Sequence, residues 1–74
     1  MNKNSQIMYK LGNKIRIERK KHKFSQEKLA ELADLNRNFI GMIERGETNI
    51  TVKNLENIAI ALQVNIKDLF EFSL

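Results

Sequence analysis

Three consecutive polar residues, Asn36, Arg37 and Asn38, have side chains suited to reading the edges of DNA bases. An arginine guanidinium forms two hydrogen bonds to guanine, and an asparagine amide does the same to adenine. Ser25 and Gln26 stand at a predicted helix start, where backbone N–H groups favour an anion such as a phosphate. On an arbitrary helix, however, the asparagines would serve as caps and the arginine as a surface charge. The interpretation therefore depends on the elements that carry them.

Helical segments are predicted along the chain, because apolar residues recur three and four positions apart and no proline interrupts them. Ser25, Asn36 and Thr51 are suitable N-caps, and Gly46 is a common stop after a helix. The predicted segments cover residues 7–22, 25–33, 36–45 and 51–62, with a short fifth segment from residue 65. We therefore predict an all-α fold, a compact five-helix domain over residues 7–74 after a flexible segment at residues 1–6.

The second and third segments have the features of a helix-turn-helix. Ala30 provides a small residue where the two helices approach closely, and a turn at residues 33–35 redirects the chain. The core that the two helices share is predicted to comprise Leu29, Leu35, Ile40 and Ile43. Such a pair leaves the outer face of its second helix, which carries Arg37 and the two asparagines, free to enter a DNA major groove.

Charge is distributed unevenly along the chain. Residues 1–28 hold nine Lys or Arg and two Glu, a charge of +7, whereas residues 29–74 hold four Lys or Arg and seven acids, a charge of −3. The two parts sum to the net charge of +4. A basic end on a small domain is typical of a protein that binds a polyanion, although a merely solvated basic helix gives the same pattern.

The composition narrows the function further. The chain has 74 residues, no cysteine and a single histidine, His22. A chain with no cysteine and one histidine can form neither a cluster of Cys and His metal ligands nor a nucleophile–base pair. We therefore expect a protein without enzymatic activity, metal or cofactor. No stretch is apolar enough to span a bilayer and the first residues lack a signal-peptide core, so we expect a cytoplasmic protein. Because a chain this short buries a modest core, dimerisation is the expected source of additional stability.

The chain resembles the Cro and lambda-repressor type of helix-turn-helix regulator, the XRE family of bacteria and phages. The resemblance covers most of the sequence, in order and without gaps, and implies sequence-specific binding to double-stranded DNA with no small-molecule ligand. The matching features are Leu11-Gly12, Ile15-Arg16, Arg19, Ser25-Gln26, Leu29-Ala30, Ile40, Ile43-Glu44-Arg45-Gly46, Leu55, Ile58-Ala59, Ala61-Leu62 and Leu69-Phe70.

The resemblance implies roles for matched residues. Gln26 would anchor a phosphate, and Arg45 would reach another one. Arg19 and Glu44 would form a partly buried ion pair that joins the first helix to the end of the recognition helix. The residues expected to contact DNA are Ser25, Gln26, Asn36, Arg37, Asn38, Phe39, Arg45 and Asn49.

Three positions depart from the family pattern. Lys23 stands where members commonly have glycine, which predicts an unusual backbone angle or a slightly different turn. Glu18 replaces an aliphatic residue, so we expect it at the edge of the core with its carboxylate reaching solvent or a basic neighbour. Ile17 takes a position that is often polar, and no partner is assigned to it.

Two local features are similar to one branch of the family, the controller proteins of restriction–modification systems. Ile50 occupies the place of a proline that many members have after the Glu-Arg-Gly, and Arg37 is followed by a small polar residue and an aromatic, Phe39. This similarity implies a homodimer on palindromic half-sites about one helical turn apart, in front of its own gene. Controllers of this kind activate transcription at low occupancy and repress it at high occupancy.

The dimerisation region is expected at residues 65–74, which are more apolar than so short a tail needs for one core. The alternative is that these residues close the core of the monomer, and for Leu69 this alternative is favoured. The residues expected at the interface are Ile66, Leu69, Phe70 and Phe72.

Other functions stay open from the sequence. A phage-type repressor would use the same domain. So would the antitoxin of a toxin–antitoxin pair, although 74 residues leave almost no additional segment to block a toxin. Binding to a membrane surface through the basic first helix is a weaker alternative, because Glu18 interrupts the charged face.

Overall fold

The computed structural model describes residues 5–73, and this part of the chain is entirely helical apart from its connections. Its elements are α1 (Ser5–Lys21), α2 (Gln26–Ala33), α3 (Arg37–Glu44), α4 (Val52–Leu62) and the 3-10 helix η1 (Ile66–Phe70). The predicted all-α fold is confirmed, with a 3-10 helix as its fifth element. Residues 1–4 of the predicted flexible segment lie outside the described residues, and α1 begins two residues earlier than predicted.

Side chains cap three helices at the predicted positions. The Ser25 hydroxyl accepts a hydrogen bond from the backbone N–H of Lys28 at 2.9 Å, and Asn36 Oδ1 accepts one from the N–H of Asn38 at 2.7 Å. Thr51 caps α4 in the same way. Each bond satisfies one of the N–H groups that a helix start leaves without a partner, which fixes where the helix begins.

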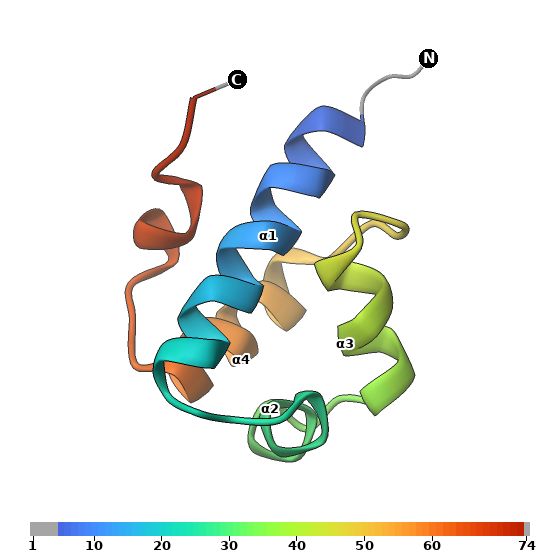
Figure 1. Ribbon diagram of the computed structural model, residues 1–74, viewed down its shortest axis with the longest axis vertical. Coiled ribbons are helices and arrows are strands. Elements are labelled where there is room, and N and C mark those ends of the chain that lie inside the picture. The colour runs from blue at the N-terminus through green and yellow to red at the C-terminus, as the bar shows by residue number, and fades with distance from the viewer. Residues whose placement is uncertain (1–4, 74) are drawn as a thin grey trace.

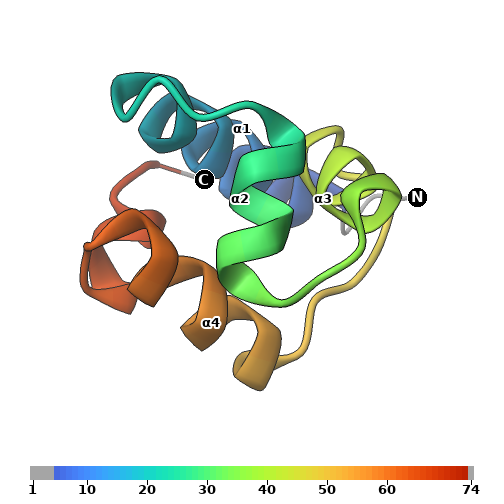
Figure 2. The same cartoon turned by 90° about the horizontal axis from the view of Figure 1, so that it is seen from below.

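The helices pack around α1, the longest of them (Figure 1). In this view α3 lies along one side of α1, and η1 with the C-terminal tail lies along the other side. Figure 2 shows α2 from below, between α3 and α4, and α2 contacts both of these helices. The helix α3 is therefore held by α1 and α2, while its remaining surface faces outward. Within the described residues, no helix combines the length and apolarity that crossing a bilayer needs.

A single core lies at the centre of these helices, and it contains the buried apolar residues that the helical periodicity predicts. Of the predicted helix-turn-helix core, only Leu35 is partly rather than fully buried. The assignment of Leu69 to the dimer interface is wrong, because this residue is 0% exposed and lies inside the chain's own core. The core residues are Leu11, Ile15, Leu29, Ala30, Ala33, Ile40, Ile43, Leu55, Ile58, Ala59, Leu62 and Leu69.

The closest approach of α1 to α3 occurs at Gly12. A Cβ atom at this position would lie 2.0 Å from the carbonyl oxygen of Ile43 and 3.0 Å from that of Glu44. Neither oxygen belongs to a flexible side chain, so only glycine lets the two helices come this near. This contact sets the position of the C-terminal end of α3 against α1.

Candidate DNA-binding site

The N-terminal end of α3 presents the three polar residues Asn36, Arg37 and Asn38, and all three are exposed. On the opposite face of the same helix Ile40 and Ile43 are buried, so the helix turns its polar edge outward. Arg37 forms no ion pair with any residue in the described part of the chain. The Asn36 oxygen is used as the helix cap, which leaves its amide N–H groups for another partner.

The C-terminal end of α3 is fixed by the ion pair that the family resemblance implies. Arg19 Nε donates to Glu44 Oε2 at 2.7 Å, and Arg19 Nη2 donates to Glu44 Oε1 at 3.0 Å. The side chains are 10% and 1% exposed, respectively. Arg19 Nη1 also donates to the carbonyl oxygen of Phe24 at 2.8 Å, in the turn before α2. One buried, bidentate pair therefore links α1, the α1–α2 turn and α3.

Gln26 joins this network, a connection that the sequence did not predict. Its amide Nε2 donates to Glu44 Oε1 at 3.1 Å, so α2 begins at a residue tied to the end of α3. One of the two N–H groups of this amide is thus used inside the protein, and the other is left for another partner. The backbone N–H groups at the start of α2 also favour an anion in this region.

Arg45 lies beside Gln26 because Gly41 leaves room for it. A Cβ atom at Gly41 would lie 3.1 Å from Arg45 Nη1 and 3.7 Å from Gln26 Oε1. Arg45 Nε also lies 3.0 Å from Glu47 Oε2 in an exposed ion pair. The hydrogen bond to Glu47, together with its charge, raises the pKa of Arg45 above the ordinary value. The role of Gly41 was not predicted from the sequence. The only indication there is that a glycine stands one helical turn before Arg45.

The other residues predicted to contact DNA have varied surroundings. Phe39 is half-buried and packs against the core, so only part of its ring is available. Ser25 is exposed but acts as the cap of α2. Asn49 is exposed in the connection between α3 and α4.

Two of the three departures from the family pattern have structural explanations. Lys23 has a φ of 60°, the left-handed conformation that glycine adopts most easily. The carboxylate of Glu18 lies 3.3 Å from Lys14 Nζ and 3.1 Å from Lys21 Nζ. Burial favours a higher pKa for Glu18, but the hydrogen bonds and charges of Lys21 and Lys14 hold it below the ordinary value of 4.5. Ile17 is exposed, and nothing in the structure explains it.

His22 connects the end of α1 to the end of α4, a contact that was not predicted. Its Nε2 donates to the carbonyl oxygen of Leu62 at 2.6 Å, and its ring stacks on Phe24 with centroids 5.1 Å apart. No sequence pattern indicates this bond, because the two residues are far apart in the chain. The bond satisfies a carbonyl group that the end of α4 would otherwise leave free.

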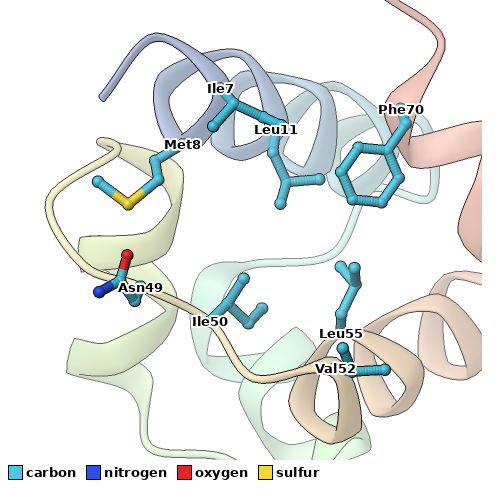
Figure 3. Close-up of a pocket in the computed structure, with 8 residues that line it drawn as sticks. All are labelled: Ile7, Met8, Leu11, Asn49, Ile50, Val52, Leu55 and Phe70. Atoms are coloured by element: carbon cyan, nitrogen blue, oxygen red, sulfur yellow. The ribbon is translucent and has the colours of Figure 1, made fainter. Parts of the chain in front are cut away.

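A second surface feature is an apolar groove of about 210 Å³ between α1, the α3–α4 connection and the start of α4, with Phe70 at one end (Figure 3). Phe70 is 39% exposed and Val52, at the start of α4, is 78% exposed. The ring of Phe72 lies 6.1 Å from that of Phe70. Phe72 and Ile66 are half-buried against the core. The groove is lined by Ile7, Met8, Leu11, Asn49, Ile50, Val52, Leu55 and Phe70.

Comparison with known proteins identifies the family that shares this arrangement of helices. A family model described as helix-turn-helix matches residues 15–69, more than half of the chain. The chain belongs to the helix-turn-helix family. Membership confirms the predicted resemblance to XRE-type regulators, and the protein is a DNA-binding transcriptional regulator, not an enzyme.

Three similar proteins show how much of the chain is shared. Control protein C.BamHI from Bacillus amyloliquefaciens is 43% identical over 74 residues, which is 99% of this chain and 89% of that protein. The restriction-modification controller protein C.AhdI from Aeromonas hydrophila has 36% identity and a TM-score of 0.84, covering 85% of this chain and 96% of the other. The immunity repressor protein of Bacillus phage phi105 is 38% identical over 56 residues, 76% of this chain and 39% of that protein.

Proposed function

We propose that the protein is a homodimeric controller of a restriction–modification system that regulates transcription from its own promoter region. The observation that carries this proposal is the match to C.AhdI over 96% of that controller's chain, together with the 43% identity to C.BamHI. The phage repressor, by contrast, shares only 39% of its length. The helix-turn-helix domain therefore accounts for nearly all of a controller but less than half of that repressor. The expected site of action is the cytoplasm of a bacterial or phage-infected cell.

The N-terminal end of α3 would read the bases. Arg37 is exposed and has no acidic partner in the described chain, so its guanidinium is available to a guanine in the major groove. Asn38 and the free amide N–H groups of Asn36 would contact neighbouring bases, and the exposed part of Phe39 would contact a thymine methyl group. These contacts suit a helix whose buried face is held by α1 and α2.

Contacts to DNA phosphates would flank the base-reading residues at the N-terminal end of α3. Ser25 and Gln26 offer the backbone N–H groups at the start of α2, and Arg45 offers a charge beside them. Asn49 would contact the backbone from the connection after α3. Breaking the exposed Arg45–Glu47 pair costs little, so that pair does not prevent Arg45 from binding a phosphate.

A second copy of the chain would pack against the surface formed by Ile66, Phe70 and Phe72. Phe70 and Val52 expose large apolar areas beside the groove in Figure 3, which water solvates poorly. A dimer also suits DNA recognition, because an eight-residue recognition helix spans only a few base pairs and two copies would read both halves of a palindrome. Light scattering is expected to give the mass of a dimer; a monomer at high concentration would contradict this part of the proposal.

The DNA-reading role is tested with Arg37→Ala. Fluorescence anisotropy would compare binding to the DNA upstream of the gene with binding to a scrambled duplex of equal length. Loss of a bidentate base contact should cost about 1–3 kcal/mol of discrimination between the two duplexes, with the stability of the protein unchanged within about 0.5 kcal/mol. Lys53→Ala, on α4 and outside the proposed DNA and dimer surfaces, is the matched control for removing a surface charge. Equal discrimination by Arg37→Ala and wild type would contradict the proposed reading residue.

The restriction–modification role itself is tested by the neighbouring genes. A methyltransferase gene and an endonuclease gene beside this one would support a controller. Integrase or phage structural genes in those positions would favour the alternative of a phage repressor, to which the similarity with the phi105 protein points.

A further inference from the structure

Lys23 occupies the turn between α1 and α2, and its side chain has no structural use there. The turn is closed by backbone bonds alone: the Lys23 N–H donates to the Lys20 carbonyl at 2.9 Å, and the Phe24 N–H donates to the Arg19 carbonyl at 3.2 Å. Glycine would form the same bonds and would adopt the φ of 60° more easily. The Lys23 side chain is exposed, and in residues 5–73 it makes no hydrogen bond or ion pair.

Two neighbouring lysines are paired, unlike Lys23, and Lys20, which is also unpaired within the described residues, lies in the last turn of α1 instead of beside the start of α2. Lys21 pairs with Glu18 at 3.1 Å, and Lys28 pairs with Glu31 at 3.5 Å. Lys23 also stands two residues before Ser25, the cap of α2, where the positive end of the helix dipole disfavours another positive charge. The backbone conformation therefore opposes a lysine at this position in the free protein, and the unfavourable positive end of α2 is set against the favourable negative end of α1, which ends two residues earlier. An anion at the start of α2 would give the Lys23 ammonium group the partner that it lacks in the described residues.

The backbone of the turn is held firmly, so the Lys23 side chain is attached at a fixed position. Arg19 Nη1 donates to the Phe24 carbonyl at 2.8 Å, and the same guanidinium is paired with Glu44 at the end of α3. Figure 2 shows the turn leading from the end of α1 directly into the start of α2. Lys23 is thereby fixed relative to the proposed phosphate-binding start of α2 and, through Glu44, to the recognition helix.

We propose that Lys23 is a further DNA-binding residue, which binds a backbone phosphate next to the one at the start of α2. This inference rests on the proposed function, because it uses the same orientation of α2 and α3 on DNA. Asp34 and Gln63 also have positive φ at the ends of helices, so the conformation alone does not identify the residue. The sign of its charge distinguishes Lys23 from both, because Asp34 beside the start of α3 is negative and Gln63 is uncharged. A phosphate contact carries no sequence information, so Lys23 adds affinity without adding specificity.

The test uses Lys23→Gly and Lys23→Gln in the full chain, with Lys53→Gln on α4, an exposed lysine outside the proposed DNA and dimer surfaces, as the matched control. Affinity is measured by anisotropy between 50 and 200 mM salt, on the upstream DNA and on the scrambled duplex. One phosphate contact contributes about 0.9 to the slope of log affinity against log salt. Over this range wild type should therefore lose about 3.5-fold more affinity per protomer than either Lys23 variant, on both duplexes. The control should behave as wild type.

Thermal unfolding separates this effect from damage to the fold. Lys23→Gly relieves the left-handed strain, so its melting temperature should not fall, even though its DNA affinity does. Lys23 variants whose salt dependence equals that of wild type would overturn the inference while leaving the proposed function intact. Wild-type protein that binds neither duplex would overturn both.

Discussion

The two ends of α3 differ in how much of their hydrogen-bonding capacity the protein itself uses. At the C-terminal end, the Glu44 carboxylate is 1% exposed and accepts bonds from Arg19 and Gln26. At the N-terminal end, Arg37 is exposed and unpaired within the described residues, and only the Asn36 oxygen is used. The hydrogen-bonding groups of the C-terminal end are paired inside the protein and position the helix. The N-terminal end keeps unused hydrogen-bond donors that DNA can pair with.

This difference arises from what packs beside each end. The C-terminal end lies against Gly12 of α1, where the backbones of the two helices almost touch. The N-terminal end follows the α2–α3 turn and projects away from α1 (Figure 1). A helix of eight residues is not stable in isolation, so α3 depends on the packed end for its structure. Changes at the packed end should therefore act on stability first, and changes at the exposed end on DNA binding alone.

The largest effect is expected from Glu44→Ala at the packed end. The change leaves the guanidinium of Arg19 buried without its partner and removes the bond from Gln26. Breaking one side of a buried ion pair costs about 3–5 kcal/mol, so urea unfolding should show most of the stability of this small domain lost.

Glu56→Ala is the matched control for this change, because it breaks the exposed pair of Lys53 and Glu56, whose atoms lie 3.3 Å apart. It should cost no more than about 1 kcal/mol. Equal losses in the two variants would show that the buried pair does not hold α3, and the contrast between the ends of the helix would fail.

A smaller effect is expected at Gly12. The methyl group of Gly12→Ala would meet the Ile43 carbonyl, so α1 and α3 must separate, and overpacking of this kind costs about 1–3 kcal/mol. Gly41→Ala, on α3, is the control, because the atom nearest to its added methyl group is in the flexible Arg45 guanidinium and not in a backbone. That change should lie within about 1 kcal/mol of wild type, because alanine favours a helix. Urea unfolding gives the free energy of unfolding of both variants. A greater loss of stability in Gly41→Ala than in Gly12→Ala would contradict the close contact proposed at Gly12.

The sequence predicts most of this architecture because local rules specify it. The caps Ser25, Asn36 and Thr51 fix where α2, α3 and α4 begin, and each bond joins residues two or three positions apart. The three-and-four spacing of apolar residues likewise places Ile40 and Ile43 on the buried face of α3. The family resemblance adds the ion pair of Arg19 with Glu44, which no local pattern indicates.

The unpredicted contacts are those between residues far apart in the chain. Gln26 reaches Glu44 and His22 reaches Leu62 only after the helices have packed, so their partners cannot be read from spacing. Leu69 illustrates the same limit. An apolar residue near the end of a chain suits either a core or an interface, and only the path of η1 over α1 and α4 decides for the core.

The smallest expected effect concerns Glu18, whose side chain is 12% exposed and thus lies between the two extremes of the comparison. Its pKa in the folded protein is below 4.5, because Lys21 and Lys14 outweigh the effect of burial. The unfolded chain therefore binds more protons in acid, so the contribution of Glu18 is complete above its unfolded pKa and disappears as pH falls through the folded pKa. Glu18→Gln should be less stable than wild type at pH 7, and urea unfolding should show the gap closing below about pH 4.5. A gap that stays constant with pH would show that Glu18 acts through packing and belongs with the uncharged core.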